Sequence, residues 1–170
     1  MKTAVVYKSS TGFTKTYAEW IADGLQCDIM DLKAVKGNEL HEYDLVIFGG
    51  WIMGNMISGL EKIKKMNLKK LVVFAVGSTP ESDTVVENIR TQNKLGGNPF
   101  FYMTGGFHFE KLNFLIRMML KTMKKSVAKK ADKTESDLYM EKYLGTSFDN
   151  SDRKYIEPLI EYVKGLNTVC

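Results

Sequence analysis

The chain has 170 residues, which fits one domain with room for a sizeable core, and we expect a single domain over 1–170. Its apolar fraction of 44% is ordinary for a globular protein, and no apolar run approaches the ~18 residues of a membrane span. The net charge of +4 is too small and too locally placed to predict a general affinity for nucleic acid.

The chain begins with a predicted strand. Residues 1–7 are too short and too soon polar for a signal peptide, so we expect a cytoplasmic protein. Cys27 and Cys170 have neither CxxC nor metal-ligand spacing, so we predict two reduced thiols and no metal site.

Short β-branched runs alternate with longer helical patterns along the chain. The predicted strands are 4–7, 27–32, 45–48, 71–76 and 100–103, and the predicted helices are 14–25, 60–66, 82–93 and 152–166. Residues 33–43 read as a loop or a poor helix. We expect Asp149, Asn150 or Ser151 to cap the last helix, and Pro158 to bend it if it falls beyond the first turn.

This alternation predicts an α/β protein, a doubly wound three-layer sandwich around a parallel sheet of five strands. Ligands of such sheets bind at the carboxyl ends of the strands, where the strand order reverses. The loops after Tyr7, Phe48 and Val76 are therefore the candidate binding loops.

The first of these loops has the composition of a phosphate site. The hydroxyls of Ser9, Thr11 and Thr14 can donate to phosphate oxygens, and Gly12 permits a close backbone approach. The helix that follows supplies N–H groups and the positive end of its dipole. The glycine patterns of a Walker loop and of a dinucleotide-binding loop are absent, and a serine or threonine cap without a ligand remains the alternative.

The pattern Ser9-x-Thr11-Gly12-x-Thr14 after the first strand resembles the FMN phosphate loop of flavodoxins. The resemblance covers essentially the whole chain. It implies a flavodoxin-like sheet with strand order 2-1-3-4-5 and a noncovalent FMN. The implied phosphate-binding residues are Ser9, Ser10, Thr11, Gly12, Phe13 and Thr14.

The same resemblance assigns the other two loops to the isoalloxazine ring. The implied contact residues are Gly50, Trp51, Ile52, Met53, Gly54 and Asn55 in one loop, and Gly77, Ser78 and Thr79 in the other. Trp51 either stacks on the flavin or packs on a neighbouring helix. The Gly54-Asn55 peptide either reorients toward the flavin or forms an ordinary turn.

An insertion at about 107–150 separates the fifth strand from the last helix, and its first part, about 110–130, is a basic amphipathic helix. Its apolar residues at helical spacing are Leu112, Leu115, Ile116, Met119, Leu120, Met123 and Val127. Between Lys111 and Lys130 there are seven basic residues and no acidic one. Packing on its own domain, a homodimer contact, and contact with a ligand or with the inner face of the membrane are the three alternatives.

Residues 100–112 followed by this Met-rich helix resemble the menaquinone-dependent protoporphyrinogen oxidase family, as do residues 148–152. That resemblance implies an FMN enzyme that takes hydride from a porphyrinogen and passes electrons to a quinone. A flavodoxin-type carrier that docks on redox proteins is the alternative, and a flavin-free interaction module is the third. The residues assign no catalytic side chain, because His41 and His108 both suit surface or capping roles.

Overall fold

The computed structural model describes residues 1–112 and 114–168, so Cys170 lies outside the described residues. The chain divides into two compact units. We call Met1–Gly105, together with the chain from Ser151 onward, the sheet unit, and Gly106–Asn150 the insertion unit.

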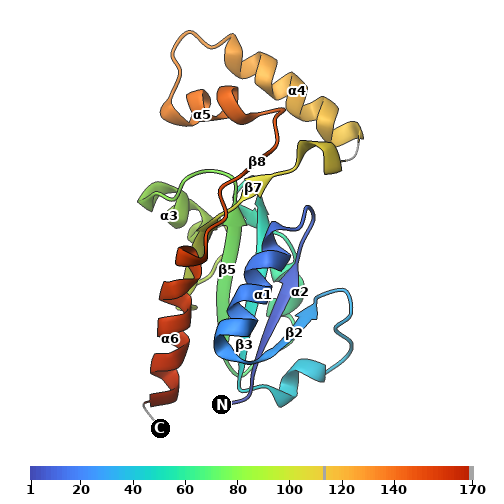
Figure 1. The fold of residues 1–170 in the computed structure, drawn as a ribbon, viewed down its shortest axis with the longest axis vertical. Helices are drawn as coiled ribbons and strands as arrows, with labels where there is room; N and C mark the ends of the chain where they lie inside the picture. Colours follow the sequence, from blue (N-terminus) through green and yellow to red (C-terminus); the bar gives the residue numbers. More distant parts are fainter. Residues whose placement is uncertain (113, 169–170) are drawn as a thin grey trace. The chain divides into compact units, whose positions relative to one another are not determined.

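Five parallel strands form the centre of the sheet unit (Figure 1). They are β1 (Thr3–Lys8), β2 (Asp28–Asp31), β3 (Leu45–Met53), β5 (Leu71–Gly77) and β6 (Phe100–Thr104). Their order is β2-β1-β3-β5-β6, which confirms the predicted order of a flavodoxin-like sheet. The central strands are apolar and buried on both faces, as expected when helices cover a parallel sheet on both sides.

Helices cover both faces of this sheet and enclose two cores. They are α1 (Phe13–Leu25), α2 (Leu60–Lys64), α3 (Asp83–Gln92) and α6 (Glu157–Thr168), with a short 3-10 helix, η1 (Glu39–Glu42), after β2. α1 and α6 share one core, in which Tyr17 and Ile21 are fully buried, and α2 and α3 share the other with Ile63 and Ile89. The apolar spacing of each helix thus decides which of its sides is turned toward the sheet.

The third strand is longer than predicted, and the expected loop over residues 50–55 is wrong for residues 50–53, which belong to the strand. β3 continues to Met53, turns at Gly54 and Asn55, and pairs antiparallel with β4 (Met56–Ile57). The strand continues past Phe48 because β5 offers it a partner as far as the pair Trp51 and Val76. The apolar periodicity of one strand carries no information on how far the neighbouring strand extends.

The predicted start of the last helix is also wrong. Asp152, rather than Asp149, Asn150 or Ser151, accepts a hydrogen bond from the N–H of Lys154 at 3.0 Å and caps a 3-10 helix, η3 (Arg153–Ile156). α6 begins only at Glu157, so Pro158 falls in its first turn, where proline is tolerated without a bend.

The described part of the insertion unit consists of two α-helices, a short 3-10 helix and a short antiparallel pair of strands, β7 (Gly106–Phe107) and β8 (Phe148–Asp149). Its helices are η2 (Phe109–Lys111), α4 (Phe114–Ala128) and α5 (Glu135–Tyr143). α4 confirms the predicted amphipathic helix, whereas α5 was not predicted. No helix among the described residues is both long and apolar enough to cross a membrane.

Candidate functional site

The three predicted binding segments meet at one edge of the sheet. Lys8 at the end of β1 is in register with Gly50 of β3, and Gly50 is in register with Ala75 of β5. β1 and β5 therefore end at nearly the same level of the sheet, beside the hairpin that β3 forms with β4. This is the carboxyl edge, where ligands of doubly wound sheets bind.

Within the β1–α1 loop the hydroxyl of Ser9 accepts a backbone hydrogen bond, and space is left open beside the start of α1. The N–H of Gly12 donates to Oγ of Ser9 at 3.2 Å, and the carbonyl of Gly12 accepts the N–H of Thr16 at 3.0 Å. Gly12 has φ of +110°, and a Cβ at this position would meet no atom within 4 Å. This glycine caps α1 without a side chain, so it leaves open space at the positive end of the helix dipole.

The loop residues differ in their access to a ligand. Ser10 is exposed, and Ser9 and Thr11 are half-buried, whereas Phe13 and Thr14 are buried, with Thr14 at 1% exposure. Phe13 and Thr14 belong to the first turn of α1, where their backbone is the part suited to an anion. The loop, with Gly12 open and no acidic residue in the first turn of α1, fits a phosphate group.

The β3–β4 hairpin presents an apolar surface at this edge. Gly54 and Asn55 both have positive φ, +56° and +65°, as a tight two-residue hairpin turn requires. Met53 is 59% exposed and Met56 44% exposed, and the two are paired across the hairpin, while Trp51 is half-buried. Exposed methionines beside a tryptophan suit a flat aromatic ligand.

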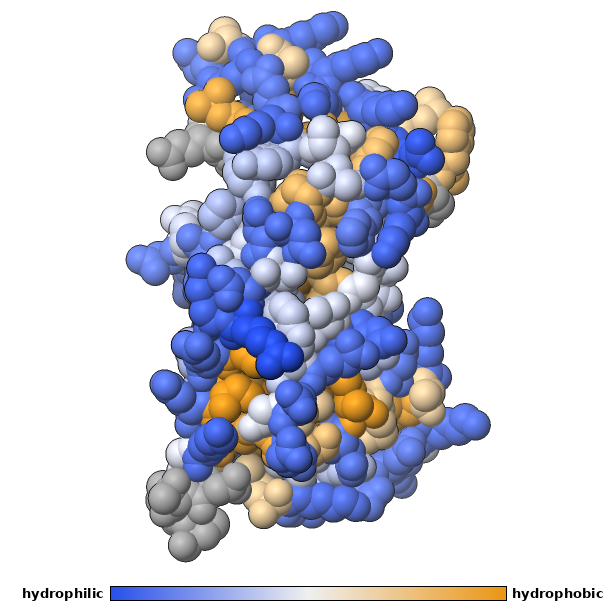
Figure 2. All heavy atoms as spheres, viewed as in Figure 1, coloured by the Kyte–Doolittle hydropathy of each residue, from blue (hydrophilic) through white to orange (hydrophobic). Residues whose placement is uncertain are grey.

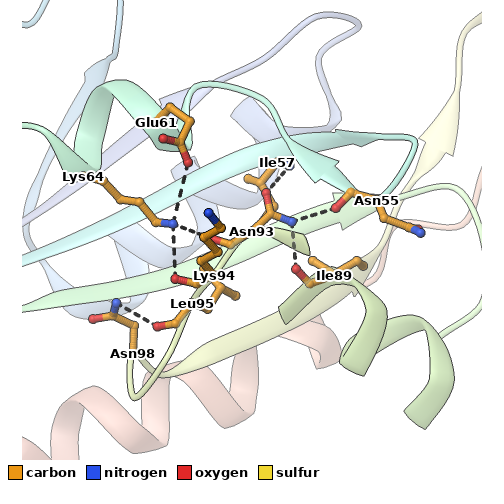
Figure 3. A network of polar contacts seen from close by, with 9 residues as sticks. All are labelled: Asn55, Ile57, Glu61, Lys64, Ile89, Asn93, Lys94, Leu95 and Asn98. Atoms are coloured by element: carbon orange, nitrogen blue, oxygen red, sulfur yellow. Dashed lines mark hydrogen bonds and ion pairs between the residues drawn. The ribbon is translucent and has the colours of Figure 1, made fainter. Parts of the chain in front are cut away.

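Asn93, at the end of α3, holds this hairpin in place (Figure 3). Its Oδ1 accepts the N–H of Ile57 at 2.8 Å, and its Nδ2 donates to the carbonyls of Asn55 at 2.7 Å and Ile89 at 2.8 Å. Lys64 donates in turn to the carbonyl of Asn93. Asn93 is 2% exposed, so these bonds are made in a site from which water is nearly excluded.

The loop after β5 is positioned by a tyrosine of the neighbouring strand. The hydroxyl of Tyr102 donates to the carbonyl of Thr79 at 2.6 Å. A Cβ on Gly77 would lie 2.2 Å from that hydroxyl oxygen, so only glycine fits under the tyrosine. Ser78 and Thr79 are half-buried at the mouth of this loop.

Tyr17 ties together the two places where the chain leaves and re-enters the sheet unit. Its hydroxyl donates to the carbonyl of Thr104 at 2.6 Å and accepts the N–H of Asp152 at 3.1 Å. The sequence pattern predicts no site role for Tyr17, Asn93 or Tyr102. No local signal reveals their roles, since each acts on a segment distant in sequence.

Two further features of the sheet unit concern a tyrosine of β1 and a hollow at the other edge of the sheet. Burial, and next the charge of Asp31, raises the pKa of Tyr7 above the usual range of a tyrosine. An open hollow of about 500 Å³ lies at the opposite edge, since Leu45 and Leu71, the first residues of β3 and β5, line it. Its place at the amino ends of the strands separates it from the candidate site.

Comparison with known proteins identifies the family. A family model described as a flavodoxin domain matches residues 4–137. Solved structures similar to the chain include a flavodoxin from the domain Archaea, at 21% identity over 85% of this chain and 94% of that one, with a TM-score of 0.46. Flavodoxin 2 from Bacillus cereus shows 20% identity over 61% and 86%, with a TM-score of 0.43. A flavoprotein in complex with FMN from Lactobacillus acidophilus shows 15% identity over 61% and 91%, also with a TM-score of 0.43. None of the curated proteins matches the chain.

The family match covers most of the chain and includes all three binding segments. The observed strand order β2-β1-β3-β5-β6 is that of a flavodoxin-like sheet. The chain belongs to the flavodoxin domain family and is an FMN-binding redox flavoprotein.

Proposed function

We propose that the chain is an FMN-dependent oxidoreductase that takes hydride from a porphyrinogen and passes the electrons to a quinone. The open, glycine-capped β1–α1 loop carries the cofactor assignment. The substrate assignment is supported by residues 100–112 and the insertion that follows them, which resemble menaquinone-dependent protoporphyrinogen oxidases.

Each segment of the carboxyl edge has a role in this proposal. The hydroxyls of Ser9, Ser10 and Thr11 and the first-turn N–H groups of α1 hold the phosphate of FMN. The apolar hairpin surface of Trp51 and Met53 packs against the isoalloxazine ring. These residues orient the flavin and exclude water, and FMN, when bound, supplies the hydride and electron chemistry.

The cofactor is tested first, by the absorption spectrum of the purified protein with and without added FMN. We expect a yellow protein, or a colourless one that takes up FMN. Gly12→Ala should weaken FMN binding about tenfold or more, because a side chain at this positive φ strains the loop by roughly 1–3 kcal/mol and enters the phosphate space.

Gly96→Ala is the matched control. Gly96 also has positive φ, +55°, and open space at its Cβ position, but it lies between α3 and β6, away from the phosphate loop. Both variants should lose some stability, and only Gly12→Ala should lose affinity. Equal affinities for the two variants would remove the β1–α1 loop from the proposal.

The substrate is tested by anaerobic mixing of the FMN-loaded protein with protoporphyrinogen and a menaquinone analogue. We expect the flavin absorbance to bleach with the porphyrinogen and to return with the quinone. A flavin that exchanges electrons with redox proteins but never with a porphyrinogen would favour the electron-carrier alternative and leave the FMN assignment intact.

A further inference from the structure

The insertion unit exposes a row of large apolar side chains along α4. The exposed fractions are 70% for Phe114, 77% for Leu115, 52% for Met118, 49% for Met119 and 41% for Met123. We call these five residues the α4 stripe. Soluble monomers rarely expose apolar side chains in such a continuous patch, so the stripe indicates a contact surface. Figure 2 shows apolar side chains beside hydrophilic ones on the surface of this unit.

The stripe is only one side of the apolar face that the sequence predicts. A helix turns about 100° per residue, so the α4 stripe covers roughly half of the circumference. Ile116 and Leu120 are half-buried and Val127 is buried, on the side of α4 that packs against α5. Intramolecular packing therefore uses three apolar residues of α4 and leaves the α4 stripe outside.

The remaining arc of the helix is basic. Arg117, Lys121 and Lys124 occupy it, Lys125 lies at its border on the line of Phe114 and Met118, and α4 contains no acidic residue. The insertion unit has nine basic and six acidic residues, and thus contributes +3 to the net charge of +4.

Two of the acidic residues on α5 are engaged in ion pairs. Asp137 pairs with Lys130 and Glu141 with Lys133, each at 2.7 Å. These two carboxylates thus pair with lysines that lie outside α4. Lys121 and Lys125 of α4 are exposed.

We propose that α4 docks the protein on the surface of a bilayer rich in anionic lipid. The α4 stripe enters the boundary between headgroups and acyl chains, and the flanking cations lie among the lipid phosphates. With 15 residues, α4 is only about 22 Å long, shorter than the ~30 Å of a hydrocarbon core, so it lies along the surface.

Charge favours lipid over a second copy of the chain. Two α4 helices joined through their stripes would bring their basic arcs close together at the rim of the contact, where like charges repel. An anionic headgroup layer instead complements both the apolar and the basic sides of the helix. The proposal is independent of the proposed enzymatic reaction, since vesicle binding requires no substrate.

The full FMN-loaded protein is tested by co-sedimentation with vesicles. We expect binding to phosphatidylcholine–phosphatidylglycerol vesicles at low salt, and about tenfold or weaker binding to phosphatidylcholine alone, since polybasic segments need an anionic surface. Raising the salt to about 0.5 M should weaken the anionic binding, since charges are then screened.

Three double variants separate the causes. Leu115→Asn with Met119→Asn removes apolar contact without changing charge, and Lys121→Glu with Lys125→Glu reverses the basic arc. Each should weaken vesicle binding about tenfold or more while FMN absorbance and circular dichroism stay unchanged. Lys65→Glu with Lys70→Glu makes the same net-charge change at exposed lysines of the sheet unit and should bind as the unaltered protein does.

Two results would overturn the proposal. One is a co-sedimentation result in which the protein binds neither kind of vesicle, binds neutral and anionic vesicles equally, or binds just as well when α4 carries the substitutions. The other is a dimer in light scattering that the Leu115→Asn and Met119→Asn variant dissolves, with no vesicle binding by the unaltered protein. That result would assign the α4 stripe to a second copy of the chain.

Discussion

At the scale of single residues, buried polar groups determine the geometry of the candidate site at the carboxyl edge of the sheet. Asn93, Tyr102 and Tyr17 each satisfy the backbone of a segment remote in sequence. A buried carbonyl or N–H without a partner costs free energy, so each of these side chains fixes its segment in one conformation.

Asn93→Leu should lower the free energy of unfolding by roughly 3 kcal/mol, because the N–H of Ile57 and the carbonyl of Asn55 lose their buried partner. The freed hairpin should also shift the reduction potential of bound FMN. Urea unfolding and a potentiometric titration measure the two effects. Asn98→Ala is the control, since Asn98 bonds only locally, to the carbonyl of Leu95 at 3.0 Å. An unchanged potential in Asn93→Leu would show that the hairpin does not tune the flavin.

Cys27 should be a slow nucleophile. Burial, and next the charge of Asp28, raises the pKa of its thiol to about 11. The folded state thus keeps a proton that the unfolded chain loses near pH 9, so stability should fall as the pH rises from about 9 to 11. Alkylation in a Cys170→Ser background should be slow at pH 8 and accelerate toward pH 11. A rate at pH 8 equal to that in urea would contradict this.

At the scale of elements, a suitable cap residue does not by itself fix where a helix begins. The last helix of the sheet unit, α6, begins at Glu157, after a 3-10 helix that Asp152 caps, and not directly after Asp149, Asn150 or Ser151. In the insertion unit, α5 forms within a polar stretch because Thr134 and Asp137 build a reciprocal capping box. That box reads as Thr-x-x-Asp in the sequence, the one local signal for α5 that could have been used.

Asp137 should make the insertion unit sensitive to acid. The hydrogen bond from Lys130, and next those from the backbone and hydroxyl of Thr134, lower the pKa of its carboxyl to about 2. A lowered pKa means that the stabilisation is complete above about pH 4, the value of an unfolded aspartate, and is lost as the pH falls toward 2. An NMR titration of the Asp137 carboxyl checks this. Asp132→Asn is the control, in which Asp137 should titrate as it does in the unaltered protein. A midpoint near 4 in the folded protein would contradict it.

At the scale of the whole molecule, the chain is a flavodoxin fold interrupted once. The interruption begins after β6 and ends before η3, and the hydroxyl of Tyr17 bonds to both ends, at Thr104 and Asp152. The two stems of the insertion are therefore held close together by a residue of the sheet unit, in addition to the pairing of β7 with β8.

Replacing residues 106–150 by a short Gly-Ser linker should leave a folded sheet unit that binds FMN. The stems need little chain to connect them, and the three binding segments all belong to the sheet unit. The flavin spectrum and a thermal melt measure the result. If the shortened protein is insoluble or colourless with FMN present, the sheet unit depends on the insertion for its fold.

The sequence by itself determined the chain order of the five sheet strands and of the helices that cover them, the parallel sheet and the amphipathic helix after β6, because these follow from local periodicity and turn chemistry. Only the tertiary structure decided that β3 runs on through Trp51, that Asn93 and Tyr102 hold two of the binding segments, and that the α4 stripe stays exposed. Each of these depends on a partner that is distant in the chain. The residue pattern of one segment indicates whether that segment prefers helix or strand. Which segment it pairs with or packs against is decided only in the folded chain.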